Sequence, residues 1–150
     1  MKKIISLALV LILCLATLCS CEIFDPLVHA EEYTRAFLAC LENDDYIGAV
    51  QYLHPRSEIP RIGLQDAIAQ MEDELGIDFS DKIEFESLAS LESQTGYMAV
   101  GGYTFVTYLV FRVTIDEKDA VLEVVYLENE LGNGIHNIGI SLSSSAAFGS

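Results

Sequence analysis

The spacing of apolar residues changes once along this chain of 150 residues, and the change limits the folds that it can adopt. Before Lys82, apolar residues recur every three or four positions, which is the period of an amphipathic helix. After Lys82 they recur every second position, as in strands with one buried and one exposed face. Helices therefore precede strands, and this order predicts an α+β domain in which N-terminal helices pack on one face of a curved, antiparallel sheet.

Three helices are expected in the first half of the chain. Pro26 follows an aspartate, a pair typical of an N-cap and the first helical position. Gly76 is a favourable residue for ending the third helix, because glycine adopts the left-handed backbone conformation of many C-caps. The expected helices span residues 26–41, 46–53 and 60–75.

Four strands are expected to form a meander, in which each strand pairs with the next one in the sequence. Turn residues at 94–96, 116–119 and 132–134 separate them. The glycine pair at 101–102 predicts a bulge or bend inside the second strand. The expected strands span residues 82–92, 97–115, 120–128 and 135–142.

The pairing of the two central strands follows from their side chains. If their loop is symmetric about Glu117 and Lys118, the numbers of opposed residues sum to 235, and one face of the hairpin is wholly apolar. Arg112 then lies opposite Glu123 on the other face. A shift by one residue would mix apolar and charged side chains on both faces, so we expect the first register.

The loop of the last hairpin decides which way the fourth strand faces. A two-residue loop at Asn133 and Gly134 would turn Ile140 away from the core. We therefore expect a loop of three or five residues there, with a glycine bulge as one way to form it. Such a loop places three apolar residues of the strand in the core: Ile138, Ile140 and Leu142.

The first 21 residues predict export from the cytoplasm. Two lysines precede an apolar run of 15 residues, 4–18, which is shorter than the about 20 residues of a membrane-spanning helix and is typical of a secretory signal. The following Leu-Cys-Ser-Cys resembles a bacterial lipobox, with Cys21 as the residue that takes the lipid. An uncleaved signal anchor is the alternative. The expected organisation is a signal peptide (1–20), a lipidated cysteine and tether (21–25), one α+β domain (26–143) and a flexible tail (144–150).

Charge and cysteine content limit the partners of the processed chain. Residues 21–150 carry six Lys and Arg against 23 Asp and Glu, a formal charge of −17. Such a surface repels phosphate backbones and anionic headgroups, so we exclude nucleic acid and expect membrane contact only through acyl chains on Cys21. The chain is then expected in the bacterial cell envelope, outside the cytoplasm.

Cys40 is the remaining thiol, and its apolar helical surroundings indicate a buried, inert side chain.

Three segments carry a resemblance to a known superfamily. The first helix, the stretch LENDDYIGAVQYLHP (41–55) and the stretch YLENELGNGIHNIGIS (126–141) are similar to small bacterial lipoproteins of the nuclear transport factor two-like superfamily, also called cystatin-like or ketosteroid-isomerase-like. The resemblance covers about residues 26–142. It implies a sheet curled as a cone around the helices, and many lipoprotein members have no assigned activity.

The resemblance also implies where an enzyme's residues would lie, namely a carboxylate base with a tyrosine and acid pair inside the cone. The inner positions expected on the central strands carry no carboxylate, so we assign no catalytic residue, no cofactor and no metal. The three histidines also lack the spacing of metal ligands. If the cone holds a pocket, its polar lining is expected to be Tyr33, Tyr103, Tyr126 and His136.

The outer face of the predicted sheet is more apolar than solvent contact requires. It is expected to bind a second copy of the chain or an envelope protein, unless the C-terminal tail or the curl of the sheet covers it. The leading prediction is therefore a non-enzymatic binding or assembly domain. A small-molecule pocket in the cone is the alternative, and an isomerase-like enzyme comes third. The residues of this expected interface are Val106, Tyr108, Val110, Val121, Val125 and Leu127.

Overall fold

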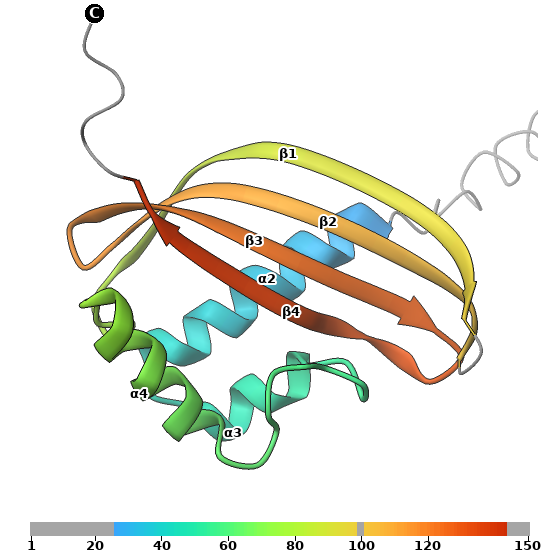
Figure 1. Cartoon of the computed structure of the whole chain (residues 1–150), viewed down its shortest axis with the longest axis horizontal. Helices are drawn as coiled ribbons and strands as arrows, with labels where there is room; N and C mark the ends of the chain where they lie inside the picture. Colours follow the sequence, from blue (N-terminus) through green and yellow to red (C-terminus); the bar gives the residue numbers. More distant parts are fainter. Residues whose placement is uncertain (1–25, 99–100, 144–150) are drawn as a thin grey trace, which may run out of the picture.

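The computed structural model describes residues 26–98 and 101–143, which form helices on one side of a four-stranded antiparallel sheet (Figure 1). The strands follow the order β1-β2-β3-β4, so the α+β class and the meander are confirmed. The signal peptide, Cys21 with its tether, and the tail lie outside the described residues. The elements are α2 (Pro26–Glu42), α3 (Tyr46–Ala49), the 3-10 helix η1 (Val50–Tyr52), α4 (Leu64–Leu75), β1 (Ile83–Met98), β2 (Gly102–Ile115), β3 (Lys118–Asn129) and β4 (Gly132–Leu142).

The helices follow the predicted spans with two differences. The predicted second helix ends earlier, because α3 is followed by the 3-10 helix η1 and the backbone of Leu53 is already extended. Helix α4 begins at Leu64 rather than at residue 60, after Gly63 in the left-handed conformation. Its predicted end is confirmed, since Gly76 is left-handed and its N–H bonds to the carbonyl of Glu72.

Helix α2 supplies the helical side of the core. Ala30, Phe37, Leu38 and Leu41 are almost completely buried and lie at helical spacing. At the end of the helix, the Glu42 carboxylate accepts a hydrogen bond from the backbone nitrogen at the start of β1. The helix is therefore fixed to the sheet by its apolar stripe and by a polar contact at its end.

The predicted turn at 94–96 is wrong, because these residues continue β1 and pair with 104–106 of β2. The chain reverses at the glycine pair instead, where Gly101 and Gly102 have φ angles of 97° and 65°. These angles favour glycine, since they are strained for residues with a Cβ. The two glycines, which were predicted to bend the second strand, thus lie where the chain turns from β1 into β2. Strand β1 is therefore longer than expected.

The hairpin of β2 and β3 closes with a tighter turn than expected. Asp116 and Glu117 alone form it, with φ angles of 49° and 59°, as in a type I′ turn. Opposed residue numbers therefore sum to 233, as for Phe111 and Leu122, and the predicted sum of 235 is wrong.

This shift changes the neighbours of the two outer charges. Arg112 lies opposite Val121, and Glu123 lies opposite Val110. Because the shift is two residues, each side chain keeps its predicted face, and Arg112 and Glu123 are both exposed on the outer face.

The last hairpin turns at Glu130 and Leu131, earlier than the predicted loop at 132–134. Register shifts once, where the pair Val125–Asn137 is followed by Tyr126–Ile135 and His136 is left over as a bulge. The bulge, rather than a longer loop, turns Ile138 and Ile140 toward the core as predicted, and both are half-buried. The prediction that Leu142 lies in the core is wrong, because its side chain is 38% exposed at the end of the strand. Three residues of β4 then lie opposite core residues of β3: Ile138, Ile140 and Leu142.

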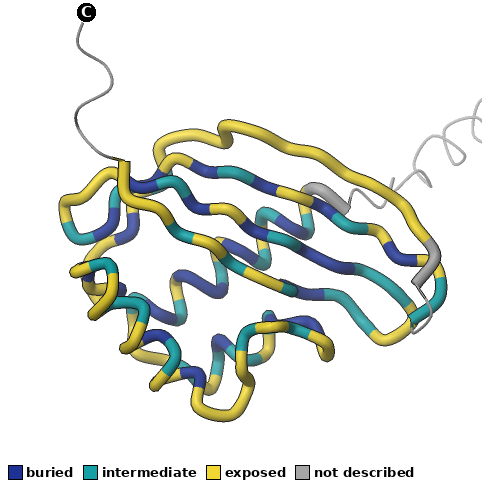
Figure 2. The backbone as a smooth tube through the Cα atoms, viewed as in Figure 1, coloured by how far each residue is buried: buried dark blue, intermediate teal, exposed yellow. Residues whose placement is uncertain are grey.

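The core lies between α2 and the inner faces of β2, β3 and the first part of β4. Its strand residues alternate with exposed ones, as in Leu109, Phe111 and Val113. Strand β1 takes little part, since it is exposed from residue 86 to residue 96 (Figure 2). All almost completely buried apolar side chains of the core cluster fall between Ala30 and Ile135, so residues 22–150 contain the whole core of the described structure.

Candidate functional site

An apolar pocket of about 180 Å³ lies between α2, α4, the loop at 58–60 and β4. Eleven of its thirteen lining residues are apolar, and the two polar ones are Glu58 and Asn137. The apolar walls come chiefly from Phe37, Leu38 and Leu41 of α2, Ala67, Ile68 and Met71 of α4, and Ile138 and Ile140 of β4.

The local sequence explains why this space stays open. Helix α4 buries only Leu64 and Ile68 almost completely, while Met71 remains half-buried at the pocket. The loop before α4 crosses to the edge of β4 and supplies Ile59 and Pro60 as a second wall. The pocket therefore depends on where the segment between η1 and α4 is held.

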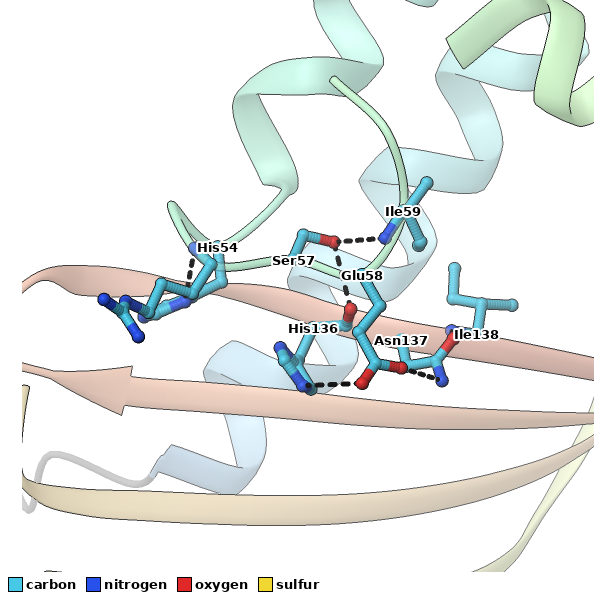
Figure 3. A network of polar contacts seen from close by, with 8 residues as sticks. His54, Ser57, Glu58, Ile59, His136, Asn137 and Ile138 are labelled. Carbon is cyan, nitrogen blue, oxygen red and sulfur yellow. Dashed lines mark hydrogen bonds and ion pairs between the residues drawn. The ribbon is translucent and has the colours of Figure 1, made fainter. Parts of the chain in front are cut away.

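Segment 53–59 is held by pairing with the edge of β4 (Figure 3). Leu53 forms a parallel bridge with Ile135, and the His54 backbone nitrogen donates to the Ile135 carbonyl at 2.9 Å. The Ser57 hydroxyl and the Glu58 backbone nitrogen both donate to the carbonyl of His136, at 3.0 and 2.8 Å. The segment thus acts as a short extra strand and covers this part of the sheet edge.

Glu58 lines the pocket, and its carboxylate lies between His136 and Asn137 at the edge of β4 (Figure 3). Its Oε2 accepts a hydrogen bond from Nδ2 of Asn137 at 2.8 Å, and its Oε1 lies 3.7 Å from Nε2 of His136. The Glu58 side chain remains 63% exposed. A negative charge is therefore oriented beside an apolar cavity while keeping contact with water.

His54 anchors the other end of the segment from inside the protein. The imidazole is completely buried, and its Nδ1 accepts a hydrogen bond from the Arg56 backbone nitrogen at 3.1 Å. Its Nε2 therefore carries the proton and donates to Oδ1 of Asn129 at 3.3 Å. Burial lowers the pKa of His54, because the charged imidazolium would lose its hydration.

The four residues predicted to line a pocket do not share one site. Tyr33 and Tyr126 meet edge to face, with ring centroids 5.5 Å apart, and the Tyr33 hydroxyl donates to Oδ1 of Asn133. His136 lies beside Glu58, whereas Tyr103 is 73% exposed. None of the four is among the residues that line the apolar pocket.

The inner face of β3 carries one carboxylate beyond Tyr126, although no carboxylate was expected on the inner face of the central strands. Glu128 is two residues further along β3 and on the same face, and its Oε2 is buried. Burial, followed by the neighbouring Tyr33 and Glu128, raises the pKa of Tyr126. Tyr126 is completely buried, so this arrangement keeps a protonated phenol in the core.

The predicted residues of the outer sheet face differ in exposure. Tyr108 is 41% exposed, while Leu127 is only 4% exposed and offers little surface to a partner. The remaining four residues, Val106, Val110, Val121 and Val125, are half-buried. The apolar surface is therefore a narrow stripe around Tyr108, with Arg112 and Glu123 exposed next to it.

No helix in residues 26–98 and 101–143 combines the length and the apolar character needed to span a bilayer. Within the same residues, no three His, Cys, Asp or Glu side chains are grouped so as to hold a metal ion.

Protein-family models, curated proteins and solved structures were each searched, and none matches the chain.

Proposed function

We propose that this chain is a non-enzymatic binding module of the bacterial cell envelope, anchored by lipid on Cys21, and that its ligand site is the pocket between α2, α4 and β4. The observation that carries the proposal is the pocket itself, an apolar cavity with only two polar lining residues. Ligand sites in proteins commonly have this character, with few polar groups set in apolar walls.

The size of the pocket indicates the size of its ligand. Cavities of about 150 Å³ in protein cores bind benzene, whereas drug-sized ligands occupy roughly 300 to 1,000 Å³. A volume of about 180 Å³ therefore fits one ring or a short branched chain. The ligand is a small molecule, or a larger one of which only an apolar group enters.

The lining residues favour binding over catalysis. Glu58 is the only titratable residue among them, and the set contains no serine, cysteine or histidine that could act as a nucleophile or base.

The membership in the nuclear transport factor two-like superfamily, with its cone-shaped sheet, belongs to the same proposal. Its support is the bowed sheet with the helices on one side (Figure 1).

A second surface supports an assembly role. The stripe around Tyr108 on the outer sheet face is proposed to contact a second copy of the chain or an envelope protein. Its support is the exposure of Tyr108 next to half-buried valines on two central strands.

Nuclear magnetic resonance titration with benzyl alcohol tests the pocket, using residues 22–150 labelled with ¹⁵N and ¹³C-methyl groups. We expect saturable shifts confined to the pocket, at Ala67, Ile138 and Ile140. Ala67→Met should fill the cavity and weaken binding, while Gln70→Met, on the exposed side of the same helix, should not. The absence of saturable shifts, or equal binding by both variants, would contradict the proposal.

A further inference from the structure

The charge of the pocket lining comes from a single side chain. Glu58 is the only charged residue of the lining, and Asn137, the other polar one, is neutral. Within residues 26–98 and 101–143, no lysine or arginine forms an ion pair with Glu58. The pocket therefore presents an apolar interior and a single negative charge in its lining.

The contacts of Glu58 leave its carboxylate able to bind a further donor. A carboxylate offers about four acceptor sites on its two oxygens. Asn137 occupies one of them on Oε2, and the His136 nitrogen at 3.7 Å from Oε1 is beyond hydrogen-bond distance. The carboxylate can thus accept from a further donor while the Asn137 contact keeps the side chain in place.

The exposure of Glu58 also limits the hydration that a cation would lose on binding beside it. Its side chain is 63% exposed, so a cation beside it would retain much of its water. The formal charge of the whole chain is −15, which raises the local concentration of cations and lowers that of anions.

We infer that the pocket binds small organic cations, in which a compact apolar group is joined through one or two carbons to a protonated amine. The apolar group lies among residues such as Ile68, Met71 and Ile138, and the ammonium donates to the carboxylate of Glu58. This inference rests on the proposed function of the pocket and adds the charge of the ligand to it.

The test compares three ligands of nearly equal size, benzylamine, benzyl alcohol and benzoate, by the same titration of residues 22–150 at pH 7. At low ionic strength we expect benzylamine to bind about three- to five-fold more tightly than benzyl alcohol, which is the range of a partly exposed ion pair. Benzoate should bind more weakly than the alcohol. Added salt should reduce the preference for the amine.

Two variants with the same change in net charge separate a local from a general effect. Glu58→Gln should bring the affinities for amine and alcohol to within about two-fold of each other. Glu92→Gln, on exposed strand β1, should leave the wild-type preference unchanged. Unaltered binding of benzyl alcohol by both variants shows that the pocket is intact.

The outcomes distinguish the two proposals. Equal affinities of the wild type for amine and alcohol, or the same preference in Glu58→Gln as in the wild type, would overturn the inference while leaving the apolar pocket as a ligand site. Saturable binding of none of the three ligands would overturn both.

Discussion

Gly134 lies directly against the backbone of His54, because a Cβ atom built on Gly134 would be 2.6 Å from the His54 nitrogen. The φ angle of Gly134 is 150°, which also disfavours other residues. This contact lets segment 53–59 approach β4 and form the wall of the pocket.

Substituting this glycine should release the segment. We expect Gly134→Ala to lower the free energy of unfolding by about 2 kcal/mol or more, as overpacked positions do. Gly96→Ala is the matched control, since a Cβ there meets nothing within 4 Å, and its effect should stay within about 0.5 kcal/mol. Urea unfolding of residues 22–150, followed by far-ultraviolet circular dichroism, measures both. Equal midpoints for the two variants would contradict the contact.

Burial of His54 should make stability depend on pH. Because its pKa is lowered in the folded state, the unfolded chain binds a proton more readily below about pH 6.5. The stability contributed by neutral His54 is therefore complete above that pH and is lost as the pH falls toward the folded-state pKa. Urea midpoints measured from pH 8 to pH 5 should fall less steeply in His54→Gln than in the wild type. Parallel curves would mean that His54 is not the group responsible.

The two faces of β2 should respond very differently to truncation. Phe111 is completely buried and meets the ring of Phe85 at 5.3 Å, so Phe111→Ala should destabilise by about 3 to 5 kcal/mol. Arg112 is exposed on the other face, and Arg112→Ala should change stability by less than about 1 kcal/mol. Chemical denaturation of both variants checks the assignment of faces, which comparable losses would refute.

Lipid attachment should depend on one of the cysteines only. Cys21→Ser should abolish labelling of the full-length chain by a palmitate analogue in bacteria, because the thiol of Cys21 would carry the lipid. Cys40→Ser should label as the wild type does. Burial, followed by the charge of Asp45, raises the pKa of the Cys40 thiol and makes it a poor nucleophile. Undiminished labelling of Cys21→Ser would exclude the lipoprotein assignment.

Self-association through the outer sheet face should be sensitive to charge. If residues 22–150 dimerise at rising concentration in sedimentation experiments, Tyr108→Lys with Val125→Glu should restore the monomer without unfolding it. The two new charges lie opposite each other in the register and can pair on the exposed face, but both would lose their hydration in a dimer interface. Gln65→Lys with Gln70→Glu, on exposed positions of α4, should not. A wild type that stays monomeric at all concentrations would leave this surface without a role in self-association.

Strand faces could be predicted because they depend on local alternation, whereas register could not. A turn was expected within residues 116–119, but it uses positive φ angles at Asp116 and Glu117, which are not glycine, so the sequence did not indicate which two residues form it. An error of two residues preserved every face, which is why Arg112 was placed correctly but given the wrong opposite residue.

The pocket could not be predicted because its walls come from distant parts of the chain. Glu58 and Asn137 are 79 residues apart in the sequence, and His54 and Asn129 are 75 apart. Gly134 was a sequence signal for the position of segment 53–59. Its place in the chain suggests a turn residue, but a glycine is needed there because the His54 backbone lies close to it. Tyr33 and Tyr126 were expected to line a pocket, but they pack on each other and do not line this cavity.

The start of α2 at Pro26 sets a limit on how far the pocket can stand from a membrane. With lipid on Cys21, four residues (22–25) separate the anchor from the helix, and the five Cα-to-Cα steps from Cys21 to Pro26 can extend at most about 18 Å. The pocket wall begins at Phe37, eleven residues further on, which adds about 16 Å along the helix axis. The binding site would then lie within about 35 Å of the bilayer surface, so this domain would sample ligands and neighbours only from a thin layer next to its own membrane.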